Sequence, residues 1–491
     1  MAWIPYPGSS KGVMMTCFAR RGGQGGSTVL WRHHLQDRKL QKREKRKEST
    51  TEEKWENTAK PSMSHQLWFP HSDTTTDTTL LHRLPNLLSA AHFTLDGYDG
   101  HVQLFNSHDL NKIIRAEYED PMYMRLALEA QEQWRTDPVL KRYFHKTGIL
   151  FIGIEAPGQA VVRSYEKVLG EGNSPAVLLD PEDAKARFGG IFQDGDWTGV
   201  TKCTWNPLAG WGDAANALRA VIQSAVDIGI KYIQATVTKV AFDSNSNCSG
   251  ITTLEDTQLS ADKVILCTGA YTPWILAESA PDRPEIQARN RMVAAASIMC
   301  AFSLPEDQVE KFSDCPIVVH PMGEYPAECI PQSGPGLIKC THERSFTHKV
   351  FHEASKQDIS VPPPRVTQQT FSQDVPQGLK DEAKAARDKL FGNWINNMEP
   401  KQYRMCWDSI TPNQDWIISP HPHVQNLYIV GGGSFHAWKF LPNVGKYVVQ
   451  MIDNELGEEF VRRWAWDRSD EGGNCASYIP TRDLKDVPGY S

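Results

Sequence analysis

A run of apolar residues that ends in three consecutive glycines is the feature that most constrains the fold of this chain. Leu427-Tyr-Ile-Val430 has the composition of a buried strand, and Gly431-Gly-Gly433 follows it directly. Because glycine has no Cβ, the backbone of such a turn can approach a ligand closely. His436 and Lys439 lie on the element that comes next. The pattern therefore indicates a strand, a turn beside a ligand, and a cationic pair after it.

A cysteine precedes this turn in the segment Arg404-Met-Cys406-Trp-Asp408. From the residues alone, Cys406 has two interpretations, a buried small hydrophobe or a reactive thiol. The chain has ten cysteines, which are scattered without the spacing of a disulfide framework or a zinc site. We therefore expect no metal site and a reduced, intracellular setting.

Length and charge exclude several classes of protein. A chain of 491 residues exceeds one compact core, so we expect two intertwined domains. The net charge of −7 argues against a nucleic-acid partner, which would select a basic face.

The sequence has no run of about 18 apolar residues, so we expect no membrane span. We find no secretory signal and no C-terminal Ser-Lys-Leu, so we expect a cytoplasmic protein, with a peroxisomal location left open.

From about residue 120 the chain has the pattern of a globular α/β protein. Apolar residues at helical spacing predict helices over 120–134 and 214–226. Apolar and β-branched runs predict strands over 148–153, 231–240 and 262–267. The order of these elements predicts a wound α/β sheet.

Thr268, Gly269 and Ala270 follow the last of these predicted strands. Their turn would lie at the carboxyl end of a strand, which is the edge where open α/β sheets bind ligands. Residues 276–400 are richer in proline and irregular in spacing, which favours a mostly antiparallel lobe that covers the ligand. The predicted fold class is thus α/β, with a Rossmann-like domain built from non-contiguous segments and a β-rich antiparallel substrate domain.

The first hundred residues contain an altered dinucleotide-binding fingerprint. A strand predicted over 13–19 precedes a glycine-rich turn. The candidate cofactor-binding residues of this turn are Gly23, Gly25, Gly26 and Ser27. Their spacing departs by about one residue from the pattern that seats a pyrophosphate on a helix N-terminus. The acid that ends the second predicted strand, Asp96, comes much later than the expected interval of about 20 residues. A flexible glycine-rich loop is the alternative interpretation.

A polar insertion explains most of that excess distance. Residues 36–47 are a dense charge run, and residues 74–79 are a tract of threonine and aspartate. Such a composition cannot bury enough apolar surface to compensate for the entropy of ordering. We expect a solvated, disordered insertion over 36–90. The alternative is a nuclear-localisation or nucleic-acid patch.

Five segments together resemble the sarcosine oxidase and fructosyl amino acid oxidase (amadoriase) family of amine oxidases. The resemblance covers roughly residues 91–491 and is carried by 107–118, 205–213, 264–274, 336–343 and 404–442. It implies an FAD cofactor attached covalently through Cys406. It also implies oxidation of a secondary amine in an N-substituted amino acid of the sarcosine, pipecolate or fructosyl amino acid type. The products would be an imine and hydrogen peroxide.

The same resemblance implies roles for individual residues. Lys339 would promote the reaction with oxygen, because a cation stabilises the negative charge that develops there. His436 would lie near the flavin. Arg115 and Lys439 would hold the substrate carboxylate, and Glu343 would contact the substrate. The implied cofactor-binding residues are Gly23, Gly25, Gly26, Ser27, Asp96, Lys112, Thr268, Gly269, Ala270, Cys406, Gly432, Gly433 and Ser434.

Read without the family, some of these residues have simpler interpretations. The segment around Lys112 and Arg115 would be an exposed basic helix start. Lys339 and Glu343 would be a solvated surface pair. For the whole chain, the alternatives to an oxidase are a dehydrogenase with a non-oxygen acceptor and a catalytically inactive, flavoprotein-like binding protein.

The implied domain plan alternates between two domains. The FAD-binding domain would comprise the altered start 1–35, then 91–146, 205–275, and 401–491 with the C-terminal tail. The substrate domain would comprise 147–204 and 276–400. The expected partners are a small amino-acid derivative and O2, without nucleic acid or membrane, and we expect a monomer.

Overall fold

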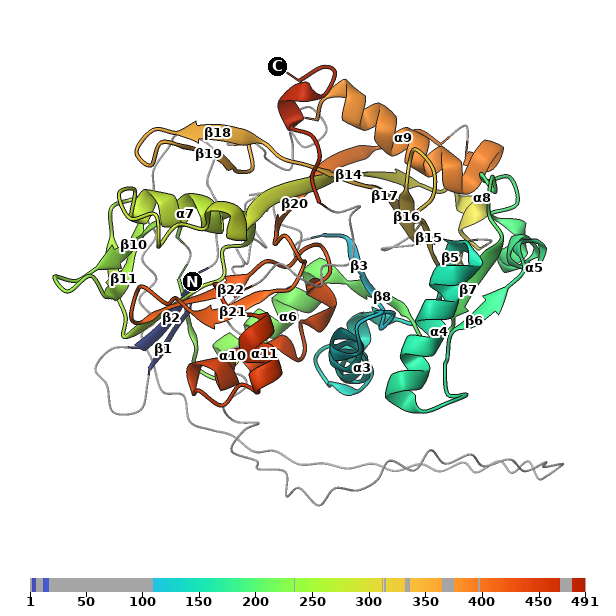
Figure 1. Cartoon of the computed structure of the whole chain (residues 1–491). Coiled ribbons are helices and arrows are strands. Elements are labelled where there is room, and N and C mark those ends of the chain that lie inside the picture. Colours follow the sequence, from blue (N-terminus) through green and yellow to red (C-terminus); the bar gives the residue numbers. More distant parts are fainter. Residues whose placement is uncertain are drawn as a thin grey trace, which may run out of the picture. The chain divides into compact units, whose positions relative to one another are not determined.

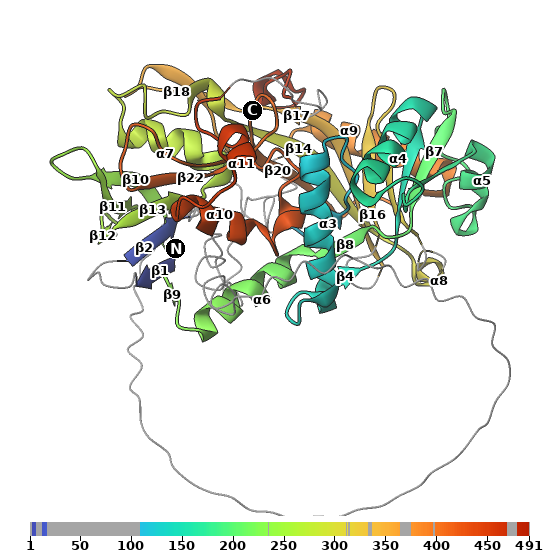
Figure 2. The same cartoon turned by 60° about the horizontal axis from the view of Figure 1, so that its bottom comes forward.

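Two large β-sheets with helices packed on them make up the computed structural model (Figures 1 and 2). The structure describes residues 2–5, 12–16, 109–233, 235–310, 312, 315–331, 336–363, 375–395, 398–468 and 479–490. All of them belong to the unit formed by residues 1–22 and 79–491. The architecture confirms the predicted α/β fold class.

The larger sheet has eight strands in the order β20-β14-β17-β16-β15-β5-β7-β6. Only β15 and β5 pair in parallel, and the other neighbours are antiparallel. The strands are β5 Ile149–Gly153, β6 Val177–Leu179, β7 Lys202–Asn206, β14 Val293–Ser303, β15 Ile317–His320, β16 Ala327–Ile330, β17 Leu337–Phe346 and β20 Gln402–Ile410. Strands predicted over 148–153 and a β-rich lobe after residue 276 are thereby confirmed.

The two faces of this sheet differ in chemistry. Along β17, Ile338 and Cys340 point into a buried core that α9 (Gln377–Phe391) covers. Lys339 and Glu343 occupy alternate positions and therefore lie on the opposite face. One strand thus joins the hydrophobic core to a polar cavity.

The smaller of the two sheets has six strands in the order β21-β22-β13-β2-β1-β9. β13 pairs in parallel with both β2 and β22, whereas β21 and β1 pair antiparallel with their neighbours. The strands are β1 Ala2–Pro5, β2 Gly12–Thr16, β9 Lys231–Tyr232, β13 Lys263–Leu266, β21 Ile417–Pro420 and β22 Leu427–Gly431. The strands predicted over 13–19, 262–267 and 427–430 are thus confirmed in type.

The dinucleotide fingerprint is tested only at its first strand. β1 occupies the edge of β2 that faces away from β13. The predicted glycine turn (Gly23, Gly25, Gly26, Ser27), the insertion over 36–90 and the strand that ends in Asp96 lie outside the described residues.

Three small sheets complete the strands in the part of the chain that the structure describes. They are β10-β11-β12, β18-β19 and β3-β8-β4. Their strands are β3 Asn111–Ile114, β4 Phe144–His145, β8 Gly210–Asp213, β10 Val237–Phe242, β11 Cys248–Thr253, β12 Gln258–Ser260, β18 Lys349–His352 and β19 Gln357–Ser360. The single strand predicted over 231–240 is wrong. Its two ends form β9 and β10, because they pair with different neighbours, β1 and β11.

The predicted helices begin at capping residues. α3 (Pro121–Thr136) starts after Asp120, whose side chain accepts a hydrogen bond from the Met122 amide at 2.8 Å. α6 (Ala214–Asp227) starts after Asp213 in the same way. The other α-helices among the described residues are α4 Glu155–Leu169, α5 Pro181–Ala186, α7 Thr272–Ser279, α8 Glu306–Val309, α10 Val444–Ile452 and α11 Glu458–Arg463. Within the described ranges, no helix has the length and apolarity that a membrane crossing requires.

Candidate active site

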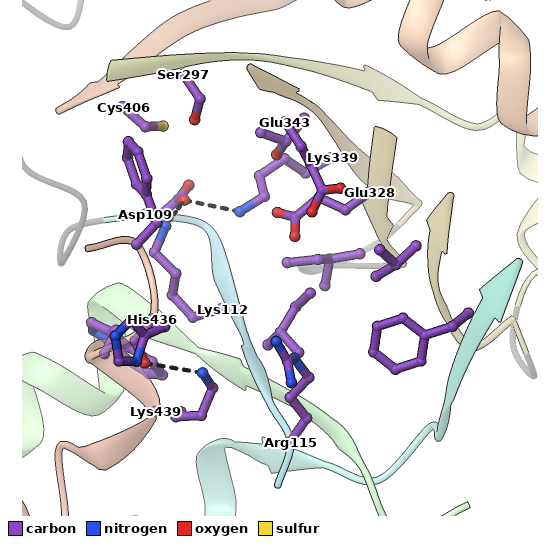
Figure 3. A pocket seen from close by; sticks show the side chains of 17 residues that line it. Asp109, Lys112, Arg115, Ser297, Glu328, Lys339, Glu343, Cys406, His436 and Lys439 are labelled. Atoms are coloured by element: carbon purple, nitrogen blue, oxygen red, sulfur yellow. Dashed lines mark hydrogen bonds and ion pairs between the residues drawn. The ribbon is translucent and has the colours of Figure 1, made fainter. Parts of the chain in front are cut away.

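A cavity of about 120 Å³ lies on the polar face of the eight-stranded sheet (Figure 3). Strands of that sheet line one side of it, and β3 and the loop after β22 line the other. The lining residues are Asp109, Lys112, Ile113, Arg115, Phe151, Ser297, Val319, Glu328, Ile330, Lys339, Thr341, Glu343, Cys406, Phe435, His436, Trp438 and Lys439. Among them are the seven predicted site residues Lys112, Arg115, Lys339, Glu343, Cys406, His436 and Lys439.

A buried carboxylate gathers three cations at one end of the cavity. Lys339 Nζ lies 2.9 Å from Asp109 Oδ2, and Lys112 donates to the same oxygen. Arg404 approaches the other oxygen of Asp109 at 4.0 Å. Burial opposes ionisation of Asp109, but Lys112, Lys339 and Arg404 outweigh it and hold the pKa of Asp109 far below its usual range. The carboxylate is therefore ionised, and it fixes the position of Lys339.

Cys406 lies beside this charged cluster. It is buried on β20, directly opposite Ser297 of β14. Burial and the Asp109 carboxylate raise the pKa of the Cys406 thiol, while Arg404, Lys112 and Lys339 act in the opposite direction. A thiolate formed here would have cations beside it, which suits a nucleophile that attacks a bound group.

A second cationic group, formed by Arg115 and Lys439, lies at the other end of the cavity next to Tyr118. Lys439 Nζ donates to Tyr118 Oη at 2.8 Å and to the His436 carbonyl at 2.9 Å. Arg115 and Lys439 lie over the Tyr118 ring, 5.4 and 5.0 Å from its centroid. Burial and the neighbouring Arg115 lower the pKa of Lys439 well below its usual value.

His436 is a neutral imidazole with both ring nitrogens bonded. Nε2 lies 2.9 Å from the Gln414 carbonyl, and Nδ1 lies 3.0 Å from Tyr118 Oη. A carbonyl can only accept, so Nε2 donates and Nδ1 accepts from the tyrosine hydroxyl. Burial and Lys439 lower the pKa of His436 to about 3. Hydrogen bonds thus connect Lys439, Tyr118, His436 and Gln414 in one chain.

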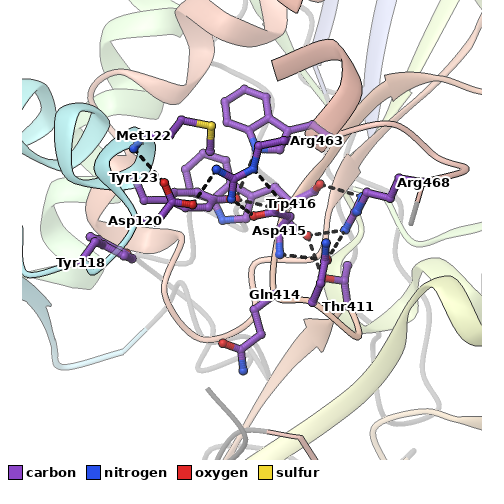
Figure 4. A network of polar contacts seen from close by, with 12 residues as sticks. Tyr118, Asp120, Met122, Tyr123, Thr411, Gln414, Asp415, Trp416, Arg463 and Arg468 are labelled. Atoms are coloured by element: carbon purple, nitrogen blue, oxygen red, sulfur yellow. Dashed lines mark hydrogen bonds and ion pairs between the residues drawn. The ribbon is translucent and has the colours of Figure 1, made fainter. Parts of the chain in front are cut away.

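The backbone that carries Gln414 is held by the network in Figure 4. Arg463 binds both carboxylate oxygens of Asp415, at 2.7 and 3.0 Å, and also pairs with Asp120 at the start of α3. The Trp416 amide donates to Tyr123 Oη at 3.2 Å. Helix α11, helix α3 and the segment after β20 are thereby tied together behind His436.

The loop after β22 has an unusual backbone. Gly432, Ser434 and Phe435 have positive φ angles of 69°, 48° and 60°. A Cβ on Gly432 would lie 2.5 Å from the Thr411 methyl, so the backbone at this position requires glycine. The Phe435 amide donates to Asp408 Oδ2 at 2.8 Å. The acid of the Arg404–Asp408 segment therefore anchors the loop that carries His436 and Lys439.

Other predicted cofactor-binding residues lie away from this cavity's lining. Thr268 bonds Thr272 through their hydroxyls at 2.8 Å, and Gly269 begins a short 3-10 helix after β13 with a φ of 49°. Ala270 is buried in the core under the eight-stranded sheet. Gly432, Gly433 and Ser434 belong to the loop rather than to the lining. Their roles toward the cofactor stay predictions.

The structure corrects two simpler interpretations of the charged residues. Lys112 is the second residue of strand β3 and does not lie at an exposed helix start. Lys339 and Glu343 are 3% and 7% exposed, so they are not a solvated surface pair.

Sequence reasoning missed Asp109, Tyr118 and Glu328. Asp109 could have been found from its spacing of three residues before Lys112. Glu328 could have been found as the one acid within the apolar strand Ala327–Ile330. Tyr118 carries no signal of its own, because its partners come from the far end of the chain.

A partly buried chain of side chains connects β17 to the C-terminal segment. His342 Nδ1 lies 3.1 Å from Glu382 Oε2 on α9. Arg482 binds both oxygens of Glu382 at 2.6 Å. His342 is next to Glu343 in sequence and on the opposite face of the strand.

The lining suits the reactive part of a flavin. A thiol, a hydrogen-bonded lysine next to it, and a neutral histidine from a glycine-rich loop face one cavity. Cys406, Lys112 and Lys339 would hold the ring system, and the glycine turn predicted for the pyrophosphate lies outside the described residues. Within the described ranges, no group of three or more metal-ligating side chains is found.

Known proteins are similar to this chain in sequence and in fold. A model of the FAD dependent oxidoreductase family matches residues 102–451. L-saccharopine oxidase of Schizosaccharomyces pombe is 25% identical over 405 residues, which are 78% of this chain and 88% of that protein. Monomeric sarcosine oxidase of Bacillus sp. (strain B-0618) is 25% identical over 364 residues, 73% of this chain and 84% of that protein. The structure of fructosyl peptide oxidase from E. terrenum superimposes with a TM-score of 0.68 at 25% identity, covering 84% of this chain and 94% of that one. From the matched family model, this chain belongs to the FAD-dependent oxidoreductases.

Proposed function

We propose that this protein oxidises a secondary amine in an N-substituted amino acid, with FAD as its cofactor and O2 as the electron acceptor. The observation that carries the proposal is the pair Arg115 and Lys439, which lie over one tyrosine ring and face the same cavity as Cys406. The names of the related proteins, saccharopine oxidase, sarcosine oxidase and fructosyl peptide oxidase, support an amino-acid derivative as substrate.

The substrate carboxylate would bind to Arg115 and Lys439. The planar guanidinium offers paired donors, and the lysine adds a point charge. Because burial and Arg115 lower the pKa of Lys439, an arriving carboxylate would favour its charged form. The substrate would thereby be oriented before the reaction, which lowers the entropic part of the barrier.

Bound FAD supplies the hydride acceptor and the route by which electrons reach oxygen. In the balanced reaction, the amine loses a hydride and a proton to become an imine, and O2 gains both to become hydrogen peroxide. Cys406 would hold the cofactor through its sulfur. Lys339, fixed by Asp109 at 2.9 Å and by the Asn111 carbonyl at 2.8 Å, would stabilise the negative charge on oxygen as it is reduced.

His436 would stay unprotonated in the site and would act through its hydrogen bonds. Its pKa of about 3 keeps the imidazole neutral at physiological pH. Its hydrogen bonds to Tyr118 and Gln414 position the hydroxyl that Lys439 also contacts. We therefore assign His436 to the positioning of Lys439.

Rapid mixing tests the proposal directly. The purified chain is mixed without oxygen with sarcosine, pipecolate or a fructosyl amino acid, and loss of the visible flavin absorbance is followed. We expect at least one of these amines to reduce the flavin, and admitted O2 to restore it with release of peroxide. Reduction followed by reoxidation only with an artificial acceptor would instead identify a dehydrogenase. Bound flavin without reduction by any amine would identify an inactive binding protein.

Two further expectations accompany this proposal. A monomer would elute at the size of 491 residues in gel filtration with light scattering. A cytoplasmic location would be seen by fractionation of the source cells.

A further inference from the structure

Arg115 and Lys439 place two positive charges beside one tyrosine ring. The guanidinium carbon of Arg115 and Nζ of Lys439 lie 5.4 and 5.0 Å from the centroid of the Tyr118 ring. Like charges repel each other, and the repulsion is stronger where little water screens it. Burial and Arg115 both lower the pKa of Lys439. A resident negative charge would oppose that loss of the lysine's proton.

The carboxylate of Glu117 is buried in the segment that carries this pair's arginine. Glu117 is 4% exposed and lies between Arg115 and Tyr118 in the chain. The Arg115 guanidinium donates through Nη1 to the backbone carbonyl of Glu117. This hydrogen bond folds the guanidinium back onto its own segment and holds it next to residue 117.

The two carboxylate oxygens of Glu117 have different surroundings. Oε1 accepts hydrogen bonds from Tyr165 Oη at 3.2 Å and from Asn206 Nδ2. Oε2 is buried and has no hydrogen-bond partner among the described residues. A buried acceptor without a donor is costly, and nearby positive charge reduces that cost. The hydrogen bonds to Oε1 thus fix the carboxylate in place, and the cations compensate its charge.

The charged and titratable groups around Lys439 come from several elements. Burial lowers the pKa of Lys439, and Glu117 raises it. Glu328, on β16 in the facing wall of the cavity (Figure 3), also raises the pKa of Lys439, but less than Glu117 does. Burial and Glu117 raise the pKa of Tyr118, so the hydroxyl that accepts from Lys439 stays neutral. His436, whose carbonyl also accepts from Lys439, carries a neutral ring.

We propose that Glu117 is a positioning residue of the carboxylate site, where it acts as the resident counter-charge of Arg115 and Lys439 and keeps Lys439 charged while no ligand is bound. The inference rests on the proposed function, because it takes the carboxylate of the ligand to bind at these two cations. An arriving carboxylate then meets a lysine that already carries its proton. Glu117 also limits the affinity, since its own charge repels an anion.

The proposal predicts how carboxylate binding depends on pH. Binding needs charged Lys439, so the affinity is present below the pKa of Lys439 and is lost as the pH rises through it. Removing the charge of Glu117 lowers that pKa further, so the loss should begin at a lower pH. Below both pKa values, the variant should bind the anion more tightly than the parent does, because the repulsion by Glu117 is gone. The two pH profiles should therefore cross.

N-acetylglycine and N-acetylglycinamide test this without turnover, because their nitrogen is an amide and not an amine. Binding of each to the FAD-loaded full chain is measured by titration calorimetry over a range of pH. For N-acetylglycine, Glu117→Gln should move the midpoint of the affinity loss down by roughly one pH unit, the shift that a neighbouring opposite charge typically gives. Glu119→Gln, at an exposed position two residues away, should leave the midpoint unchanged. Binding of the uncharged N-acetylglycinamide should show no such midpoint.

Glu117→Asp separates the charge of the side chain from its shape. Aspartate keeps the charge on a shorter side chain, so its midpoint should lie between those of the parent and Glu117→Gln. A structural role would instead make Glu117→Asp the weaker binder at every pH, because glutamine preserves the shape of glutamate. The proposal is overturned by that result, by a parent without a midpoint, or by an unmoved midpoint in Glu117→Gln. If only Glu117→Asp folds, an unmoved midpoint in that variant has the same meaning.

Turnover separates this inference from the proposed function. If no amine is oxidised in the rapid-mixing test while the midpoint for N-acetylglycine moves in Glu117→Gln, the proposed function fails and the role of Glu117 stands. If an amine is oxidised and the midpoint does not move, the role of Glu117 fails and the proposed function stands.

Discussion

The two sides of the cavity are built from different kinds of backbone. On one side, Cys406, Lys339 and Glu343 project from strands within the eight-stranded sheet. On the other side, His436 and Lys439 follow a loop with positive φ angles and are held by hydrogen bonds to the segment after β20. Strands fix the distances between their side chains through the ladder, whereas a loop depends on a few anchors. Under the proposed function, covalent attachment and oxygen chemistry would depend on the strand side, and carboxylate recognition would depend on the anchored loop.

The largest expected effect is on the strand side, at Cys406. Cys406→Ala removes the only thiol among the lining residues, so no flavin–peptide adduct should form. Mass spectrometry of peptides after acid precipitation measures this. Cys248→Ala, a buried cysteine on β11, serves as the matched control and should keep the adduct. An adduct retained in Cys406→Ala would show that attachment, if any, is elsewhere.

The second expected effect is a selective loss of oxygen reactivity. Lys339→Met removes the buried cation at similar length, so reoxidation by O2 should slow by about two to three orders of magnitude. Reduction by substrate should change far less. Asp109→Asn is the matched control, because it breaks the same ion pair and keeps the cation. Stopped-flow measurement gives the rate of flavin reduction by substrate and the rate of reoxidation by O2 separately. Equal losses in both rates would refute an oxygen-specific role for Lys339.

On the loop side, we expect a smaller effect that depends on the ligand. Lys439→Met removes one charge-assisted contact, worth about 1.5–3 kcal/mol, so KM for a carboxylate-bearing amine should rise roughly ten- to a hundredfold. An amine without the carboxylate should respond little to the substitution. Lys446→Met, on α10 and paired with Glu129 at 2.7 Å, is the matched control. The same factor on both amines would make Lys439 a structural residue.

The smallest effect tests the loop itself. Gly432→Ala places a Cβ 2.5 Å from the Thr411 methyl at a φ of 69°, which should reduce the free energy of unfolding by about 1–3 kcal/mol. Denaturant unfolding measures this. Gly153→Ala, at an open position on β5, provides the control and should change stability less. If the two substitutions cost the same, the loop is less constrained than its backbone angles indicate.

Local signals predicted the start of the loop side, because an apolar run followed by glycines identifies β22 and its turn. On the strand side, the local interpretation of Lys339 and Glu343 as a solvated surface pair was wrong, and only the family resemblance placed them in the site. The resemblance to amine oxidases brought seven cavity residues together from three distant segments of the chain. Spacing alone could not have done so, since no local pattern connects residue 115 with residue 439.

The remaining features depend on tertiary contacts. Asp109 is informative only because Lys112, Lys339 and Arg404 converge on it. Tyr118 is informative only because Lys439 and His436 reach its hydroxyl. The strand predicted over 231–240 failed for the same reason, because its two ends have different pairing partners.

The link from His342 through Glu382 to Arg482 has a consequence for protein engineering. Arg482 lies far along the chain from the residues that line the cavity. The side chains of Glu382 and His342 nevertheless connect it to the strand that carries Lys339. A mutant library limited to the cavity wall would omit it. Libraries meant to alter turnover should therefore include the last dozen residues, where changes can shift β17 without altering any group that touches the ligand.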